Sequence, residues 1–492
     1  MFRTAINRRA FLASTSAAFG ALITAGVPAL ASPVHRLTIA RRVIDVKGRA
    51  ASVFGLTDGN GRPGLTLEPG ERFSVVLENR IGEPTIVHWH GQTPPPDQDG
   101  VAETGYAGLV PDGATQTYDF EPRPGTHWMH SHAGLQEQQL LAAPLVVRTA
   151  SDAAADRQEV TVMLHDFSFR DPQEILATLT DGANADGHAG MDMGGAGGMA
   201  MGDMPMTGSG MGAMGGMGMM GGMDLNDIEY DAYLANDRTL DDPMVVRTEA
   251  GGRVLVRLIN AATATAFWID LGDASGTAVA VDGNPIVPRA GSRFPLAQGQ
   301  RLDLEVIVPA GTVVAVLAQR EGDRPRTGVV LAAPGAVVGK IAGVAAEPAA
   351  PADLSLETAL SAAEAVSDRA ADVAYVTMLS GSMAPYVWTI DGATWAIRRP
   401  LAVRQGQRVI VEIMNHSMMA HPMHLHGHHF RVVAINGTAI NGAVRDTVLV
   451  PPMSRVALAF DAENPGRWLF HCHNLYHMAT GMMTELTYAG TA

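Results

Sequence analysis

The sequence is short of cysteine and of positive charge. Cys472 is its one cysteine in 492 residues, which excludes a disulfide framework and any site that needs two thiolates of this chain. The 35 Lys and Arg residues are outnumbered by 50 Asp and Glu residues, and the formal net charge is −15. An acidic chain without a basic run lacks the cations that neutralise phosphates, so we expect no nucleic-acid partner.

The sequence also lacks a long hydrophobic run. The apolar stretch from Ala13 to Ile23 is rich in Ala and too short to span a bilayer comfortably, and no later stretch spans one. We therefore expect no stable membrane insertion. Apolar residues still make up 47% of the chain, as in globular proteins with a core. At about 150 residues per domain, the length predicts about three domains.

Residues 1–31 have the features of an export signal. The pair Arg8-Arg9 precedes the apolar stretch, and residues 29–31 supply a small-residue cleavage site. An uncleaved anchor is the alternative, which the short stretch disfavours. We predict a signal peptide recognised by the twin-arginine export machinery and a mature protein in the bacterial periplasm.

One pattern occurs three times, at residues 68–79, 249–260 and 404–415. Each copy is a Gly-bearing turn followed by an alternating, β-branched run that ends at Asn, and this pattern predicts a turn into a strand. Nine residues after the Asn, the first and third copies have a His-x-His-Gly motif, and the middle copy has apolar residues in place of both histidines. The three tetrapeptides are HWHG at 88–91, IDLG at 269–272 and HLHG at 424–427.

The repeat predicts an all-β protein of three homologous β-sandwich domains. We place the domains at residues 33–150, 151–335 and 365–492. The outer two carry the histidine motifs and are expected to supply ligands, whereas the middle one is a spacer without ligands. A connector at 343–372, rich in Ala, Glu and Pro, is expected to hold a short helix.

Histidine pairs point to a metal cluster. In a strand, residues i and i+2 share a face, so a His-x-His pair can serve one cluster. A single pair can simply lie on a solvated strand, but four pairs at matching offsets, in a chain with 26 Met and 17 His, indicate a transition metal. Neither outer domain alone has enough histidines for a multi-copper cluster, so we predict that the two domains meet and contribute four each. The pairs are His88/His90, His130/His132, His424/His426 and His471/His473.

Cys472 predicts a second kind of metal site. It lies between His471 and His473, so on a strand its sulfur points to the opposite face and serves a different metal. One Cys, two His and a weak axial Met form the ligand set of a blue copper electron-transfer site. The candidates for the other three ligands are His421, His477 and Met482.

The segments HWHG, HSH, HPMHLHG and HCHNLYHMATGM resemble the four signature motifs of the multicopper oxidases. The resemblance covers the whole mature chain. It implies three cupredoxin-like Greek-key domains and four copper ions: one type 1 copper that accepts electrons from a reductant, and one type 2 and two type 3 coppers that reduce O2 to water. By the resemblance, the type 1 ligands are His421, Cys472, His477 and Met482, the type 2 ligands are His88 and His424, and the type 3 ligands are His90, His130, His132, His426, His471 and His473.

The resemblance also implies a route for protons. Asp99, nine residues after His90, matches the acidic residue that delivers protons to the cluster in this family. Without the family, an ordinary Asp-Gly turn explains this residue as well. Several relatives carry a glutamate directly after the second type 1 histidine, where this chain has Met478.

Residues 188–223 contain 12 Met among 36 residues, and most of the others are Gly. Glycine at this frequency prevents a packed helix or strand, so a low-complexity loop is the simplest interpretation. Thioethers also select Cu(I), and bacterial copper-tolerance oxidases resemble this chain in having a Met-rich insert. Met419 matches a Met of the copper-efflux oxidases, whereas Ser417 stands where they have Asp. The candidate Cu(I) ligands are Met191, Met193, Met199, Met201, Met204, Met206, Met211, Met214, Met217, Met219, Met220, Met223 and Met419.

The predicted function is oxidation of Cu(I) in periplasmic copper tolerance, with laccase-like activity on phenols and aromatic amines and with O2 as acceptor. We expect a monomer. One alternative is a laccase that acts mainly on phenols, with the Met-rich loop as a lid. A copper sequestration protein and a copper-free scaffold of the same family are further alternatives. The complete ligand sets argue against both, because storage needs no blue site and the scaffold branch has lost its ligands.

Overall fold

The computed structural model describes residues 33–181, 225–364 and 369–490. The predicted signal peptide and the Met-rich segment lie outside these ranges. As predicted, strands dominate the described part, and its helices are short. The α-helices are α1 (Ala150–Ala154), α2 (Pro172–Thr180), α3 (Ser355–Ala359), which lies in the predicted connector, and α4 (Leu475–Ala479); the 3-10 helices are η1 (Pro96–Gln98), η2 (Gln136–Gln139) and η4 (Trp395–Ile397).

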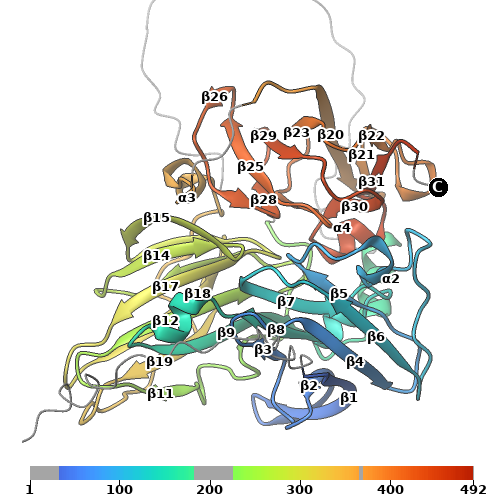
Figure 1. Cartoon of the computed structure of the whole chain (residues 1–492). Helices are drawn as coiled ribbons and strands as arrows, with labels where there is room; N and C mark the ends of the chain where they lie inside the picture. The colour runs from blue at the N-terminus through green and yellow to red at the C-terminus, as the bar shows by residue number, and fades with distance from the viewer. Residues whose placement is uncertain (1–32, 182–224, 365–368, 491–492) are drawn as a thin grey trace, which may run out of the picture. The chain divides into compact units, whose positions relative to one another are not determined.

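The strands form six sheets, which follow one another along the chain as three pairs (Figure 1). In the first pair, the strand orders are β2–β1–β4–β6 and β3–β8–β7–β5. These strands are β1 (His35–Val46), β2 (Arg49–Asp58), β3 (Leu65–Leu67), β4 (Phe73–Arg80), β5 (Val87–His90), β6 (Thr115–Phe120), β7 (Gly125–Ser131) and β8 (Ala142–Val147).

The middle pair has the orders β10–β9–β12–β17–β14–β15 and β11–β19–β18–β13–β16. Its strands are β9 (Gln158–Phe167), β10 (Ala232–Ala235), β11 (Val245–Arg247), β12 (Arg253–Asn260), β13 (Phe267–Asp270), β14 (Gly276–Val281), β15 (Asn284–Gly291), β16 (Arg293–Leu296), β17 (Arg301–Ile307), β18 (Val313–Arg320) and β19 (Arg326–Ala332).

The third pair has the orders β21–β20–β23–β29–β25–β26, with β27 on β25, and β22–β31–β30–β24–β28. Its strands are β20 (Val373–Met383), β21 (Tyr386–Ile390), β22 (Leu401–Val403), β23 (Arg408–Asn415), β24 (His421–Leu425), β25 (Phe430–Ile435), β26 (Thr438–Ala439), β27 (Val444–Arg445), β28 (Thr447–Val450), β29 (Arg455–Asp461), β30 (Arg467–Cys472) and β31 (Met483–Tyr488).

The three pairs of sheets share one scheme of strand pairing. In each, the first strand runs parallel to the strand of the repeated motif: β1 to β4, β9 to β12 and β20 to β23. In each, the last strand runs parallel to a short strand: β8 to β3, β19 to β11 and β31 to β22. We call the three pairs the first, middle and third sandwich.

The repeated glycine has the same conformation in all three sandwiches. Gly70, Gly251 and Gly406 have φ values of 80°, 69° and 81°. Side chains disfavour this left-handed region, and glycine adopts it without steric cost. The residue that marks the motif in the sequence is therefore the one that turns the chain into the strand.

The repeated asparagine anchors the loop after the strand. Asn79, Asn260 and Asn415 are all buried, and each donates from its side-chain amide to backbone carbonyls. For example, Nδ2 of Asn260 donates to the carbonyl oxygens of Thr265 and Leu296, each at 2.9 Å. A buried amide must be paired in this way. The loops fixed by Asn79 and Asn415 lead to the histidine pairs.

Candidate metal centres

Strand pairing brings the predicted histidines together within each outer sandwich. β5 and β7 place His88 opposite His130, and β24 and β30 place His424 opposite His471. The second histidine of each pair lies two residues further along, on the same face. All eight side chains are buried.

The eight imidazoles gather in one cluster that both outer sandwiches share. The ring centroids of His88 and His426 are 3.9 Å apart, and those of His90 and His424 are 3.8 Å apart. The ligand atoms form groups whose members lie within 4.8 Å of one another. The groups are His90, His130 and His473; His132, His426 and His471; and His88, His90 and His424. Each group draws on both outer sandwiches.

Six ring nitrogens of this cluster are suited to bind a metal. They are buried and have no hydrogen-bond partner in the described part of the chain: Nδ1 of His90 and Nε2 of His88, His130, His132, His424 and His473. On two of these rings the opposite nitrogen faces a backbone carbonyl oxygen: Nδ1 of His88 lies 2.9 Å from that of Asp99, and Nδ1 of His424 lies 2.9 Å from that of Asp446. A buried polar atom without a partner is costly, so the donor set fits metal ions.

Burial keeps most of these imidazoles in the form that binds metals. It lowers the pKa of five rings well below the usual value, namely those of His90, His130, His424, His426 and His471. It lowers the pKa of His473 to about 3. A neutral imidazole keeps a lone pair for a metal. His132 differs, because Glu103, 3.4 Å from its Nδ1, raises its pKa against the effect of burial.

Asp99 lies between the two outer sandwiches' histidines. Its Oδ2 is 2.9 Å from Nδ1 of His426, and its Oδ1 is 3.3 Å from Nδ1 of His88. The residue is 1% exposed. The carboxylate therefore touches two predicted copper ligands, and its role in proton delivery stays a prediction.

Cys472 belongs to a separate group with His421 and His477. Its Sγ lies 3.6 Å from Nδ1 of His421 and 3.7 Å from Nδ1 of His477, and the two Nδ1 atoms are 3.0 Å apart. A point equidistant from the three atoms is about 2.0 Å from each, close to metal–ligand distances in proteins. Met482 lies beside them, since its carbonyl accepts from the N–H of Cys472 and its N–H donates to the carbonyl of His477.

The far nitrogens of the two histidines in this group are held from two directions. Nε2 of His421 lies 2.7 Å from Oγ of Ser417, and Nε2 of His477 lies 3.0 Å from Oδ2 of Asp227. Asn474 donates to the same carboxylate oxygen at 3.0 Å. Burial would raise the pKa of Asp227, but the contacts with His477 and Asn474 hold it below its usual value. Both rings thus present Nδ1 to the sulfur.

The Cys472 thiol is suited to a cation. Burial raises its pKa above the ordinary value, so a thiolate persists there only beside a positive charge. The cysteine is free and buried, a state that is usually inert. The two Nδ1 atoms next to Sγ make it one corner of a trigonal His2Cys set, which is typical of blue copper sites.

Comparison with known proteins identifies the family. Models of the multicopper oxidases match residues 39–152 and 369–490. The chain is 34% identical over 459 residues to multicopper oxidase MmcO of Mycobacterium tuberculosis, which covers 90% of this chain and 85% of that protein. The chain belongs to the multicopper oxidases. It is therefore an oxidoreductase that binds copper.

Two further comparisons extend the likeness. A copper resistance protein A homolog of Pseudomonas syringae pv. tomato is 25% identical over 554 residues, covering 92% of this chain and 91% of that protein. The structure of Fet3p, a multicopper oxidase that functions in iron import, superposes with a TM-score of 0.74 at 16% identity, covering 93% of this chain and 91% of the other. This likeness shows the three-domain cupredoxin-like fold. Within the described ranges, no helix is long and apolar enough to cross a membrane.

The sequence motifs of the multicopper oxidases do not reveal two buried carboxylates beside the cluster. Oε2 of Glu137, in η2, lies 3.0 Å from Nδ1 of His130, and burial raises the pKa of Glu137 to about 7. Oδ1 of Asp446 lies 3.1 Å from Nε2 of His90. Metal-binding histidines in general pair their second nitrogen with such groups. A search for acids a few residues after His132 finds Glu137, but Asp446 has no comparable local signal.

Of the predicted Cu(I) ligands, the structure describes Met419. Met419 is 6% exposed and packs in the apolar core, whereas Met418 beside it is 57% exposed. The other twelve methionines lie outside the described residues.

Proposed function

We propose that this multicopper oxidase is an exported cuprous oxidase of periplasmic copper tolerance, which also oxidises phenols and aromatic amines. It works as a monomer after export by the twin-arginine route, and it holds four copper ions. The proposed type 1 ligands are His421, Cys472, His477 and Met482; the type 2 ligands are His88 and His424; one type 3 copper binds His90, His130 and His473, and the other binds His132, His426 and His471. The unpartnered ring nitrogens and the trigonal His2Cys set support these assignments.

When bound, the coppers supply the four one-electron steps that reduction of O2 requires. The protein connects the two centres through Cys472, whose backbone neighbours His471 and His473 belong to the cluster. Nδ1 of His426 lies 2.9 Å from Oδ2 of Asp99, and Nδ1 of His88 lies 2.9 Å from the backbone carbonyl oxygen of the same residue, which leaves Nε2 of both rings for metal. Asp99 thereby contacts one proposed type 2 ligand, His88, and one proposed type 3 ligand, His426, and we assign proton delivery to it.

The observation that carries Cu(I) as substrate is the place where the Met-rich segment rejoins the described structure. Met223 is its last methionine, and four residues later Asp227 contacts Nε2 of His477 at 3.0 Å. On the other side, α2 precedes the segment, and its Leu176 lines a cavity together with Met478, the neighbour of His477. Thioethers are soft ligands that select Cu(I). The Met-rich segment, whose composition suits Cu(I), is thus joined in the sequence to residues beside the proposed type 1 site, where electrons enter.

The test removes the thioether sulfurs of the Met-rich segment and keeps the volume of its side chains. We expect replacement of the twelve methionines of residues 188–223 by leucine, or deletion of the segment, to lower O2 uptake with Cu(I) as sole reductant at least several-fold. Oxidation of a small phenol by the same variants serves as the control and should stay at the parental rate or rise. Parental Cu(I) kinetics in the leucine variant would reduce the segment to a linker and favour a laccase.

A laccase acting mainly on phenols is the second candidate, and one cavity favours it. The cavity has a volume of about 510 Å³ and is lined in part by Trp395, Met478 and Met483, a size and lining that fit small aromatic molecules. Met478 and Met483 directly follow the proposed type 1 ligands His477 and Met482. The ratio of Cu(I) to phenol turnover in the parental protein decides between the two candidates.

A further inference from the structure

One turn of the middle sandwich lies against the histidine cluster. Residues 297–300 join β16 to β17, and Gly299 in this turn has a φ of 80°. A Cβ on Gly299 would lie 2.9 Å from Cδ2 of His473 and 3.3 Å from Cε1 of His90. The sandwich that supplies no predicted ligand therefore touches one ring from each outer sandwich.

Arg301 follows this turn, at the start of β17, and is fully buried. Its Nη1 donates to Oδ1 of Asp446 at 2.7 Å, and its Nη2 donates to Oδ2. Its Nε donates to the carbonyl oxygen of Thr126 at 3.1 Å, and Nη1 also donates to that of Gly299 at 3.0 Å. Groups from all three sandwiches thus fix the guanidinium.

Asp446 in turn contacts two rings of the cluster. Its Oδ1 lies 3.1 Å from Nε2 of His90, and its carbonyl oxygen lies 2.9 Å from Nδ1 of His424. The opposite nitrogens, Nδ1 of His90 and Nε2 of His424, are among those without a partner in the described ranges. An acceptor at one ring nitrogen selects the tautomer and leaves the other nitrogen for a metal.

We infer that Arg301 of the middle sandwich is a positioning residue for the shared copper cluster, because it holds Asp446 in the orientation that directs Nδ1 of His90 towards the metal. The inference rests on the proposed assignment of His90 and His424 as copper ligands. A bidentate Arg–carboxylate pair fixes geometry as well as charge. Through the pair of Arg301 with Asp446, the middle sandwich takes part in the oxygen chemistry of the cluster and is more than a spacer.

The test compares two buried arginines of the middle sandwich. Arg301→Met keeps the apolar stem and removes the fork. We expect about 10–100-fold weaker retention of cluster copper against a chelator, the effect typical of groups that orient metal-binding histidines. The type 2 signal in electron paramagnetic resonance should weaken, while the blue type 1 absorption persists.

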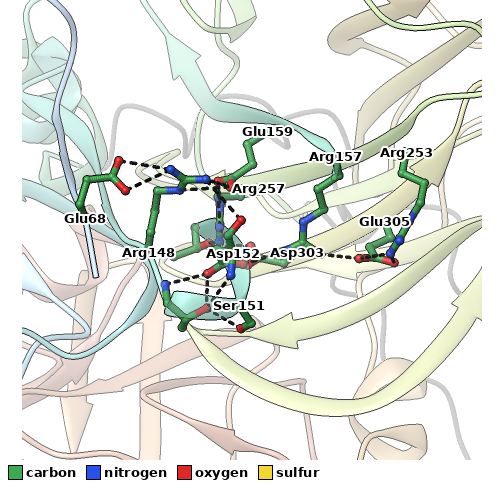
Figure 2. A network of polar contacts seen from close by, with 12 residues as sticks. Glu68, Arg148, Ser151, Asp152, Arg157, Glu159, Arg253, Arg257, Asp303 and Glu305 are labelled. Atoms are coloured by element: carbon green, nitrogen blue, oxygen red, sulfur yellow. Dashed lines mark hydrogen bonds and ion pairs between the residues drawn. The ribbon is translucent and has the colours of Figure 1, made fainter. Parts of the chain in front are cut away.

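Arg257→Met is the matched control. Arg257, on β12, is 2% exposed and pairs with Glu159 and Asp303 at 3.0 Å each (Figure 2). The variant therefore loses a buried ion pair as well, but Glu159 and Asp303 are not predicted ligands. We expect a lower unfolding temperature in both variants and loss of cluster copper in Arg301→Met alone.

The outcomes separate the inference from the assignment on which it rests. Parental retention of cluster copper in Arg301→Met, or an equal loss in both variants, would overturn the inference. If Arg301→Met does not fold, Arg301→Lys keeps the charge without the fork, and copper retention within twofold of the parent would then overturn it. An error in the ligand assignment shows differently: His90→Ala would keep the full set of cluster copper.

Discussion

Cys472 has no substitute in this chain, since it is the one cysteine of the sequence and its sulfur completes a trigonal set with two Nδ1 atoms. Cys472→Ser replaces a soft ligand by a hard hydroxyl of similar size. We expect loss of the blue absorption and of oxidase activity, with most of the other copper still bound. The absorption spectrum and the copper-to-protein ratio measure both effects, and a blue serine variant would contradict the type 1 assignment.

Glu321 is a buried carboxyl group whose effect on stability can be tested by a single substitution. Burial raises its pKa to about 7, and its Oε2 accepts from the N–H of Ala352 at 2.8 Å. In the unfolded chain the pKa is about 4.3. Between these values the folded chain holds a proton that the unfolded chain has lost, so the free energy of unfolding falls as pH rises.

Glu321→Gln keeps an accepting oxygen and removes the charge. We expect it to raise the free energy of unfolding by roughly 1–3 kcal/mol more at pH 8 than at pH 5. Thermal or denaturant unfolding of both proteins at the two pH values measures the difference. Equal stabilisation at both values would mean that the carboxyl does not titrate in this range.

The twelve predicted copper ligands could be found in the sequence because their signals are local. His88 and His90 share one strand, and Cys472 stands between two histidines. The groups that contact these ligands from distant parts of the sequence lack a local signal. Asp446 contacts His90 across 356 residues of sequence, and no local pattern announces such a contact. The copper assignments themselves stay predictions.

Among the elements, α4 carries His477 and depends on one capping residue. The side chain of Asn474 accepts from the N–H groups of Tyr476 and His477 and donates to Asp227 at 3.0 Å. Loss of such a cap costs about 1 kcal/mol. We expect Asn474→Ala to shift or weaken the blue absorption and to change the type 1 potential, because the ring of His477 loses its fixed orientation.

A second helix supplies the control. Asp171 caps α2 in the same way, accepting from the N–H of Gln173 at 2.8 Å, but α2 carries no predicted ligand. Asp171→Ala should lower stability by a similar amount and leave the visible spectrum unchanged. An unaltered spectrum in Asn474→Ala would show that the cap does not position the ligand.

The elements of the fold were predictable where the sequence repeats. The glycine turns and the terminal asparagines announce the same strand three times, and the all-β fold is confirmed. The turn at residues 297–300 was not predictable as part of the site. It belongs to the copy without histidines, and only the packing of the three sandwiches places Gly299 against His473.

At the scale of the whole molecule, the shared cluster is built from residues that lie far apart in the sequence and must act together in O2 reduction. His90 and His473 belong to the same group of three. We expect His90→Ala and His473→Ala to impair O2 reduction alike, while each variant keeps its blue type 1 absorption. Oxygen uptake and absorption spectra measure these effects.

His416→Ala is the control for these two variants, since His416 is exposed beside the type 1 loop and lies outside the predicted set. It should keep parental oxygen uptake. Parental uptake in either His90→Ala or His473→Ala would contradict a cluster built by both outer sandwiches.

Successive side chains of β30 point to opposite faces of the sheet, and this alternation limits the insertions and deletions that the gene can accept. The pairing of β30 with β24 places His471 opposite His424 and Cys472 opposite Met423, so successive residues belong to different proposed centres. One inserted codon before His471 would keep every ligand in the protein but exchange the faces of the strand. Two inserted codons would restore the faces and displace the ligands by about 7 Å. In-frame insertions and deletions in this strand should therefore be as rare among functional alleles as loss of the cysteine itself.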